Sequence, residues 1–71
     1  MTFYARTLFN NDGAESGVAV LNEKDEIQAV IRFSDTPFGD DGDLARNLAN
    51  DTMKFMAEKM NEKINESLQS S

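Results

Sequence analysis

The side chains that could do chemistry in this sequence are carboxylates, hydroxyls and lysines, because its 71 residues include no histidine and no cysteine. The chain therefore lacks the commonest general base, the commonest metal ligand, thiolate nucleophiles and disulfides. A nucleophile would have to be a serine, threonine, lysine or carboxylate with an activating neighbour, and no such grouping stands out. We expect no catalytic residue and no enzymatic activity.

Aspartates are concentrated between residues 35 and 43. An EF-hand loop needs acidic or amide side chains at alternating positions before its glycine and a glutamate after it. Pro37 and Gly39 occupy the alternating positions before Asp41 and Gly42, and no glycine-rich phosphate-binding motif is present. We expect no metal site and no cofactor. We interpret these carboxylates as groups that cap the following helix and keep the loop solvated, and that also form an acidic patch. The residues predicted to bind a partner through this patch are Asp35, Asp40, Asp41, Asp43 and Asp51.

Charge is distributed unevenly along the chain, whose 13 acids and 7 bases give a net charge of −6. Residues 34–51 carry five acids and one base, whereas residues 52–71 carry three of each. The net negative charge opposes direct binding to nucleic acid and favours a protein partner with a basic surface. Arg6 and Arg32, near Tyr4, resemble a small stacking platform for single-stranded nucleic acid. Two arginines in an acidic chain are a weak signal, and we interpret this face as solvated or covered by a partner.

Hydrophobic periodicity predicts the elements that position these side chains. Three runs within residues 1–33 alternate with period two between turn-forming residues, which predicts a three-stranded antiparallel β-meander. Residues 34–42 break the pattern and predict an acidic loop. Asp43 is the expected N-cap of a helix over residues 43–68, followed by a frayed tail over residues 69–71. The predicted fold class is α+β, in the order β-β-β-α, as one small domain over the whole chain.

The predicted helix carries two apolar stripes and is longer than the predicted strands. At 1.5 Å per residue it spans about 37 Å, whereas strands of seven or eight residues span about 25 Å. One stripe can cover the sheet and the other a partner, although one wide core-facing surface would give a similar pattern. The first stripe is Leu44, Leu48 and Phe55, and the second is Ala49, Met53, Met56, Ala57, Met60, Ile64 and Leu68.

We expect the chain to form a homodimer, because a domain of this size buries too little surface to be comfortably stable alone. Methionines adapt to irregular partners. On the sheet, the first run places Tyr4 and Leu8 on the face opposite its core side, where with Val30 they would be partly apolar and exposed. The residues predicted to contact a partner or a second copy are Met53, Met56, Met60, Ile64, Tyr4 and Leu8.

No run approaches the roughly 20 apolar residues that span a bilayer, and the first residues lack a signal-peptide pattern. We expect a protein without membrane contact in the cytoplasm, which would be that of a bacterial host cell if the chain is encoded by a phage.

In overall character the chain resembles phage-encoded accessory proteins that counter host defence, including anti-CRISPR inhibitors. It is short, acidic and free of cysteine, with a predicted small sheet and one helix. Residues 42–49 resemble the alanine-rich helix of many small phage proteins, and Ala45, Arg46 and Ala49 carry that likeness. The resemblance implies an inhibitor that occludes a basic or nucleic-acid-binding site on a larger protein, and it transfers no functional residue.

A strand-rich first half followed by an acidic helix also resembles the layout of HicB-type antitoxin domains. The sequence departs from that family because it lacks the proline-glycine-cysteine region and has no evident DNA-binding appendage. An antitoxin or small regulator acting as a homodimer is therefore the alternative interpretation. A small dimeric scaffold for assembly is a third.

Overall fold

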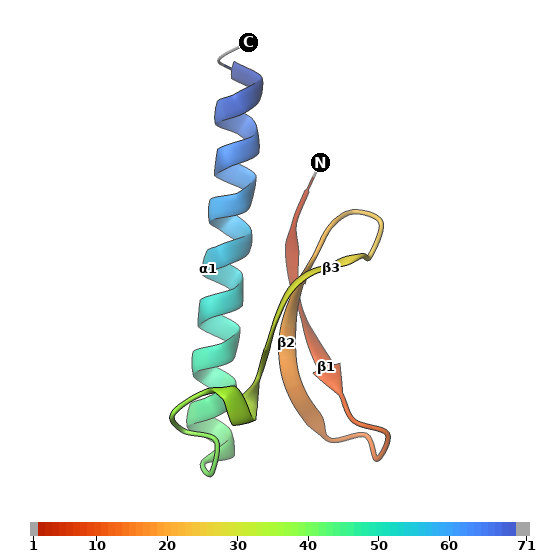
Figure 1. The fold of residues 1–71 in the computed structure, drawn as a ribbon, viewed down its shortest axis with the longest axis vertical. Helices are drawn as coiled ribbons and strands as arrows, with labels where there is room; N and C mark the ends of the chain where they lie inside the picture. The colour runs from red at the N-terminus through yellow and green to blue at the C-terminus, as the bar shows by residue number, and fades with distance from the viewer. Residues whose placement is uncertain (1, 70–71) are drawn as a thin grey trace.

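The computed structural model describes residues 2–69 and shows three antiparallel strands followed by one long helix (Figure 1). This is the predicted α+β arrangement. The elements are β1 (Tyr4–Phe9), β2 (Glu15–Leu21), β3 (Ile27–Arg32), a 3₁₀ helix η1 (Phe33–Asp35) and α1 (Gly42–Gln69). Of the predicted tail over residues 69–71, Gln69 belongs to α1 and residues 70–71 lie outside the described residues.

The sheet has the order β1-β2-β3, so β2 is its central strand. On the face toward α1, Val18 lies opposite Thr7 and Ile31, and Val20 lies opposite Ala5 and Ala29. Val18 and Val20 are the largest fully buried side chains among the described residues. The burial of these two valines therefore favours the observed register, because a slip by one residue would turn them away from α1.

Two local devices hold the turns of the meander. In the first turn Gly13 adopts a φ of +87°, a conformation that suits glycine, and the backbone N–H of Asn10 donates to the carbonyl of Ala14. In the second turn the side-chain oxygen of Asn22 accepts hydrogen bonds from the backbone N–H groups of Lys24 and Glu26, at 2.9 and 3.0 Å. These are the bonds by which asparagine favours turns.

Alanines let α1 approach the sheet closely. Ala45 and Ala49 are fully buried, and Ala57 and Met53 are nearly so. Together with Phe3, Val18 and Val20, the buried face of α1 forms the core, and Met56, Met60 and Ile64 pack against it as partly buried side chains. The second predicted stripe thus covers the sheet except at its end, where Leu68 is 69% exposed, and Leu44 and Phe55 of the first stripe are 49% and 61% exposed.

Met53 was predicted to lie on a partner surface, and that prediction is wrong. Its side chain is only 3% exposed and belongs to the core cluster. The hydrophobic periodicity of the helix predicted the apolar stripes but did not predict which of them packs against the sheet.

The helix starts at Gly42, one residue before the predicted start, and its N-cap is Asp41 rather than Asp43. The side-chain oxygen Oδ1 of Asp41 accepts hydrogen bonds from the backbone N–H groups of Asp43 and Leu44, at 3.1 and 3.2 Å. The carbonyl of Asp41 accepts the bond from the N–H of Ala45. Asp43 lies inside the first turn, where its charge favours the helix dipole.

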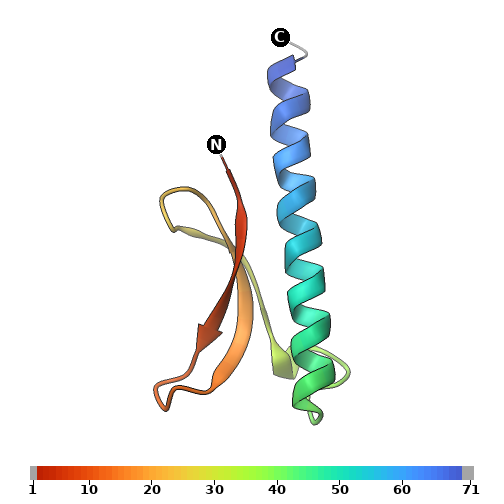
Figure 2. The same cartoon turned by 180° about the vertical axis from the view of Figure 1, so that it is seen from behind.

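The 28 residues of α1 extend well past the end of the sheet, as predicted, because they span about 42 Å against about 20–23 Å for strands of six or seven residues. Figure 2 shows the β2–β3 turn curving away from the helix. No helix within the described residues combines the length and the apolar character that a bilayer-spanning segment needs.

Asn61 clamps the start of the chain against the second half of α1. Its side-chain oxygen accepts from the backbone N–H of Phe3 at 2.8 Å, and its Nδ2 donates to the carbonyl of Phe3 at 3.0 Å. The amide thus satisfies both backbone groups of a buried residue just before β1.

Replacing the observed N-cap should lower the free energy of unfolding more than replacing the predicted N-cap. We expect Asp41→Ala to lower the free energy of unfolding by about 1 kcal/mol, because two backbone N–H groups lose their acceptor. Asp43→Ala should cost about 0.5 kcal/mol or less, since it loses a favourable charge near the helix dipole and an exposed ion pair with Arg46. Urea unfolding followed by circular dichroism compares the two variants, and a larger loss for Asp43→Ala would contradict Asp41 as the cap.

The clamp can be tested in the same way. Asn61→Ala leaves the N–H and C=O of Phe3 without partners, so we expect a loss of about 1–3 kcal/mol in unfolding free energy. Asn65→Ala, at an exposed asparagine one turn further along α1, is the matched control and should change stability by less than about 0.5 kcal/mol. Equal effects from the two substitutions would show that the clamp contributes nothing.

Candidate functional site: an acidic end and two apolar surfaces

Three segments meet at one end of the molecule, two of them consecutive in the sequence and the third distant from both. The β1–β2 turn, the segment from η1 to residue 41 and the first turn of α1 lie together at the lower end of Figure 1. Arg46 links two of them, because its guanidinium lies 2.9 Å from Asp43 and 3.8 Å from Glu15. We call this region the acidic end. Its acids are Asp12, Glu15, Asp35, Asp40, Asp41 and Asp43, and its bases are Arg32 and Arg46.

The carboxylates of the acidic end are exposed to solvent, and several of them are held in place by short-range bonds. Asp12 accepts from the N–H of Ala14 at 3.0 Å, and Asp35 accepts from the N–H of Arg32 at 3.1 Å. Asp40 makes no such bond and is fully available to a partner. The acidic end thus presents negative charge in fixed positions at one end of the elongated molecule. Within residues 2–69 no group of acids is placed to hold a metal ion.

Four of the five predicted acidic residues are brought together here, and Asp51 is not. It lies ten residues beyond Asp41 on α1, about 15 Å along the helix axis. Glu15 and Asp12 belong to the acidic end but were missed from the sequence, because they reach it only through the antiparallel return of β2. The period-two alternation of the first two runs predicted a hairpin. That hairpin was the one signal that could have placed Asp12 and Glu15 at the acidic end.

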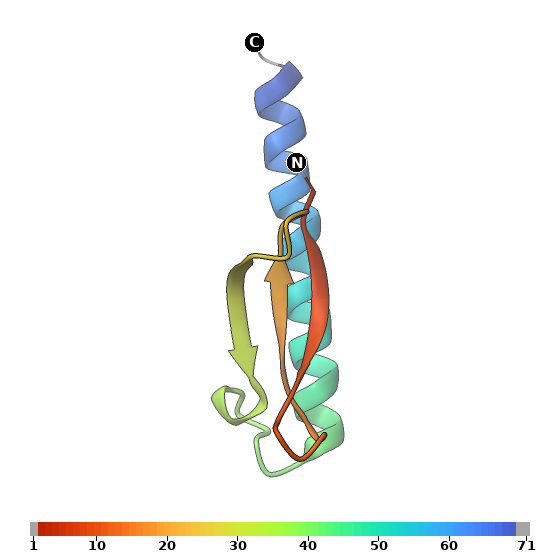
Figure 3. The same ribbon diagram turned by 90° about the vertical axis from the view of Figure 1, so that its right-hand side faces the viewer.

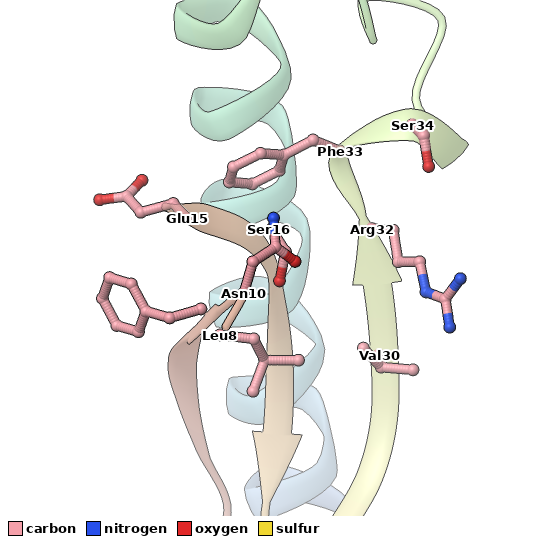
Figure 4. A pocket seen from close by; sticks show the side chains of 10 residues that line it. Leu8, Asn10, Glu15, Ser16, Val30, Arg32, Phe33 and Ser34 are labelled. Carbon is pink, nitrogen blue, oxygen red and sulfur yellow. The ribbon is translucent and has the colours of Figure 1, made fainter. Parts of the chain in front are cut away.

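A depression of about 620 Å³ lies on the outer face of the sheet, beside the acidic end (Figure 4). It forms over Gly17, because glycine leaves the central strand without a side chain between Leu8 and Arg32. A Cβ at this position would clash with the backbone oxygen of Ile31, so the close approach of β3 requires glycine. Leu8, one of the predicted partner residues, therefore lines a partly apolar hollow next to the acids.

Tyr4, the other predicted partner residue of β1, is 36% exposed at the far end of the same face. Its hydroxyl donates to the carboxylate of Asp25 in the β2–β3 turn. This hydrogen bond, more than any other cause, raises the pKa of Tyr4 above its ordinary value. Nearby, the carboxylate of Glu23 accepts from the N–H of Thr2 at 2.9 Å, and that bond lowers the pKa of Glu23. The start of the chain is thus tied to the second turn.

A second apolar surface lies on the half of α1 remote from the acidic end. It is a groove of about 330 Å³ that contains the remaining predicted partner residues, Met56, Met60 and Ile64, together with Phe3. Its rim is basic, with Lys59 and Lys63. Each lysine pairs with a glutamate three residues later, at 3.1 and 3.5 Å, and the ammonium of Lys59 also lies 5.4 Å from the ring centre of Phe55. The predicted acidic and apolar residues therefore form separate surfaces.

No protein-family model, curated protein or solved structure matches the chain. The resemblance to anti-defence proteins of phages thus stays a prediction from overall character, and any function has to be argued from the surfaces described above.

The bond between Tyr4 and Asp25 can be followed by titration, because Tyr4 is the only tyrosine. A folded-state pKa raised above the unfolded value of about 10 means that the bond stabilises the fold fully below that pH. The stabilisation is lost as the pH rises through the raised pKa. The ultraviolet absorbance of tyrosinate should therefore appear at higher pH in the folded protein than in urea.

Asp25→Asn should move that titration back toward the ordinary pKa of tyrosine, because an amide oxygen accepts a weaker hydrogen bond than a carboxylate and carries no charge. Asparagine also tolerates the positive φ of 63° at this position, so the turn should be preserved. Glu66→Gln, which removes one acid on the distant end of α1, is the control and should leave the titration unchanged. An unchanged curve in Asp25→Asn would contradict the bond.

Proposed function

We propose that the chain is a non-enzymatic protein-binding module that inhibits a larger protein by occluding a basic or nucleic-acid-binding site. The observation that carries this proposal is the acidic end, where six exposed acids and two bases from three segments lie together. Four of the six negative charges in the net balance are concentrated in this region.

The physical argument rests on complementarity of charge and shape. A concentrated negative field accelerates encounter with a basic groove and orients the complex, while dispersed charges of both signs would not. Carboxylates then take the positions that phosphates of a nucleic acid would occupy. The hollow over Gly17 adds partly apolar surface beside the acids through Leu8 and Val30, and burial of such surface supplies affinity that charge alone does not.

The source we propose is a phage or other mobile element, and the site of action is the cytoplasm of a bacterial host. The proposal follows the resemblance in size, charge and layout to proteins that counter host defence. The alternative, an antitoxin-like, regulatory or assembly protein that acts as a homodimer, is favoured by the exposed apolar side chains of β3, where Ile27 and Val30 are 57% and 52% exposed.

The experiment captures binding proteins from a bacterial lysate on the immobilised chain and elutes them with double-stranded DNA as a competing polyanion. Dissociation constants are then measured for each eluted protein with the wild type and with Asp40→Lys/Asp43→Lys. We expect the double variant to bind at least about tenfold more weakly, because it reverses two charges at the acidic end while sparing the N-cap.

The matched control is Glu58→Lys/Glu62→Lys. It changes the net charge by the same amount. Like the test variant, it replaces one acid without an ion pair, here Glu58, and one acid in an i,i+3 ion pair, here Glu62. Both of these residues lie far along α1 from the acidic end. We expect its affinity to stay within about threefold of the wild type, with affinity falling as salt is raised. The proposal is contradicted if DNA releases no bound protein, or if both double variants weaken binding equally.

A further inference from the structure

Strand β1 is one of the two edges of the sheet, because the strand order places β2 between β1 and β3. Figure 3 shows β1 along this edge, with α1 behind β2 and β1. The strand reads YARTLF and contains no proline and no lysine, the residues that commonly block an edge. Its free backbone groups can therefore be identified from the hydrogen bonds at its two ends.

Hydrogen bonds at both ends of β1 define which backbone groups face the open side. Before the strand, the N–H and C=O of Phe3 bind the side chain of Asn61 on α1 and so point away from β2. After the strand, the N–H of Asn10 donates to the carbonyl of Ala14 and so points toward β2. The hydrogen-bonding direction alternates along a strand, and both ends give the same alternation. The strand residues whose N–H and C=O groups face the open side are Ala5, Thr7 and Phe9.

The bulge in the β1–β2 hairpin does not disturb this alternation. Leu8 lies opposite Gly17 and Phe9 lies opposite Glu15, so the extra residue is Ser16, which belongs to β2. Strand β1 itself advances without an inserted residue, and a bulge bends the strand that carries the insertion. The edge of β1 therefore stays regular over its whole length.

We propose that β1 pairs in antiparallel orientation with β1 of a second copy, with the two-fold axis at Thr7. Thr7 then exchanges backbone hydrogen bonds with Thr7 of the second copy, and Ala5 exchanges them with Phe9 of the second copy. With the symmetric pair of Phe9 and Ala5, about six bonds form. Two three-stranded sheets become one six-stranded sheet with both helices on the same face. This inference does not depend on the proposed function, because the acids that carry it lie outside β1.

Free backbone groups and charge select this register. An axis at Ala5 would pair Thr7 with Phe3, whose backbone groups are already bound. An axis at Arg6 would place two arginines directly opposite each other, and like charges in that position are destabilising. With the axis at Thr7, Arg6 lies opposite Leu8 of the second copy, and the two threonines form a favourable cross-strand pair.

The two helices fit side by side in this dimer. Because α1 lies behind both β1 and β2 (Figure 3), its axis is about one strand spacing, roughly 4.8 Å, from the two-fold axis. The two helix axes are then roughly 10 Å apart, a distance at which helices pack against each other. Pairing of the strands therefore brings the helices into contact.

The test measures the mass in solution by analytical ultracentrifugation over a range of protein concentrations. The wild type should approach twice 7.9 kDa. Thr7→Pro removes an N–H that faces the open edge and is not needed by β2, a position where proline is tolerated. Circular dichroism should therefore show a preserved fold, and the chain should be monomeric.

Val30→Pro is the matched control on the other edge of the sheet. The carbonyl of Ile31 lies against Gly17 of β2, so the N–H of Val30, one residue earlier in a regular stretch of β3, faces away from β2. The same substitution at this position should leave the dimer intact.

Hydrogen exchange of the wild type locates the interface without a substitution. The N–H groups of Ala5, Thr7 and Phe9 should exchange at least about tenfold more slowly at high protein concentration than at low concentration, whereas that of Val30 should not change. A wild type that stays monomeric at every concentration overturns the proposal. So does a dimer that survives Thr7→Pro, a dimer lost equally in Val30→Pro, or a dimer in which the three N–H groups of β1 stay unprotected.

Discussion

The architecture depends on the contact between the valines of β2 and the alanine-rich face of α1. Val18 and Val20 are buried because Ala45, Ala49 and Ala57 let the helix approach closely. A helix about 10 Å wide covers about two strands spaced 4.7–4.9 Å apart. Since α1 is the only helix long enough to cover the sheet among the described residues, β3 is only partly covered on the helix side, where Ala29 and Ile31 pack against the core as partly buried side chains. This partial cover of β3 is a direct consequence of building the core from one helix.

The same contact explains why the two predicted kinds of binding surface are separate. The sheet occupies only part of the length of α1, and the acidic segments meet where the first turn of α1 joins the β1–β2 turn. The groove containing Met56 and Met60 lies further along α1, where the sheet curves away. A partner that contacts the acidic end therefore does not reach this groove unless it spans roughly 28 Å, the rise of the nineteen residues from Asp41 to Met60.

The sequence predicted the elements well because each one carries a local signal. Alternation identified the strands, and the long apolar period identified the helix and its overhang. The errors occurred where a local pattern has two equivalent solutions. Asp41 and Asp43 both suit an N-cap, and only the backbone geometry assigned the cap to Asp41. Two stripes could have covered the sheet, and Met53 lies in the one that does. Glu15 could not be placed beside Arg46 from spacing, since the two residues meet through tertiary structure alone.

The negative charge of this molecule is distributed unevenly over its surface. The acidic end carries six acids and two bases, whereas the segment from Glu26 to Arg32 carries one acid and one base and has no net charge. At moderate salt the field of exposed charges is screened over a Debye length of about 10 Å. The negative field is therefore strongest at the acidic end and weak along β3, so attraction to a basic surface would act at that end of the molecule.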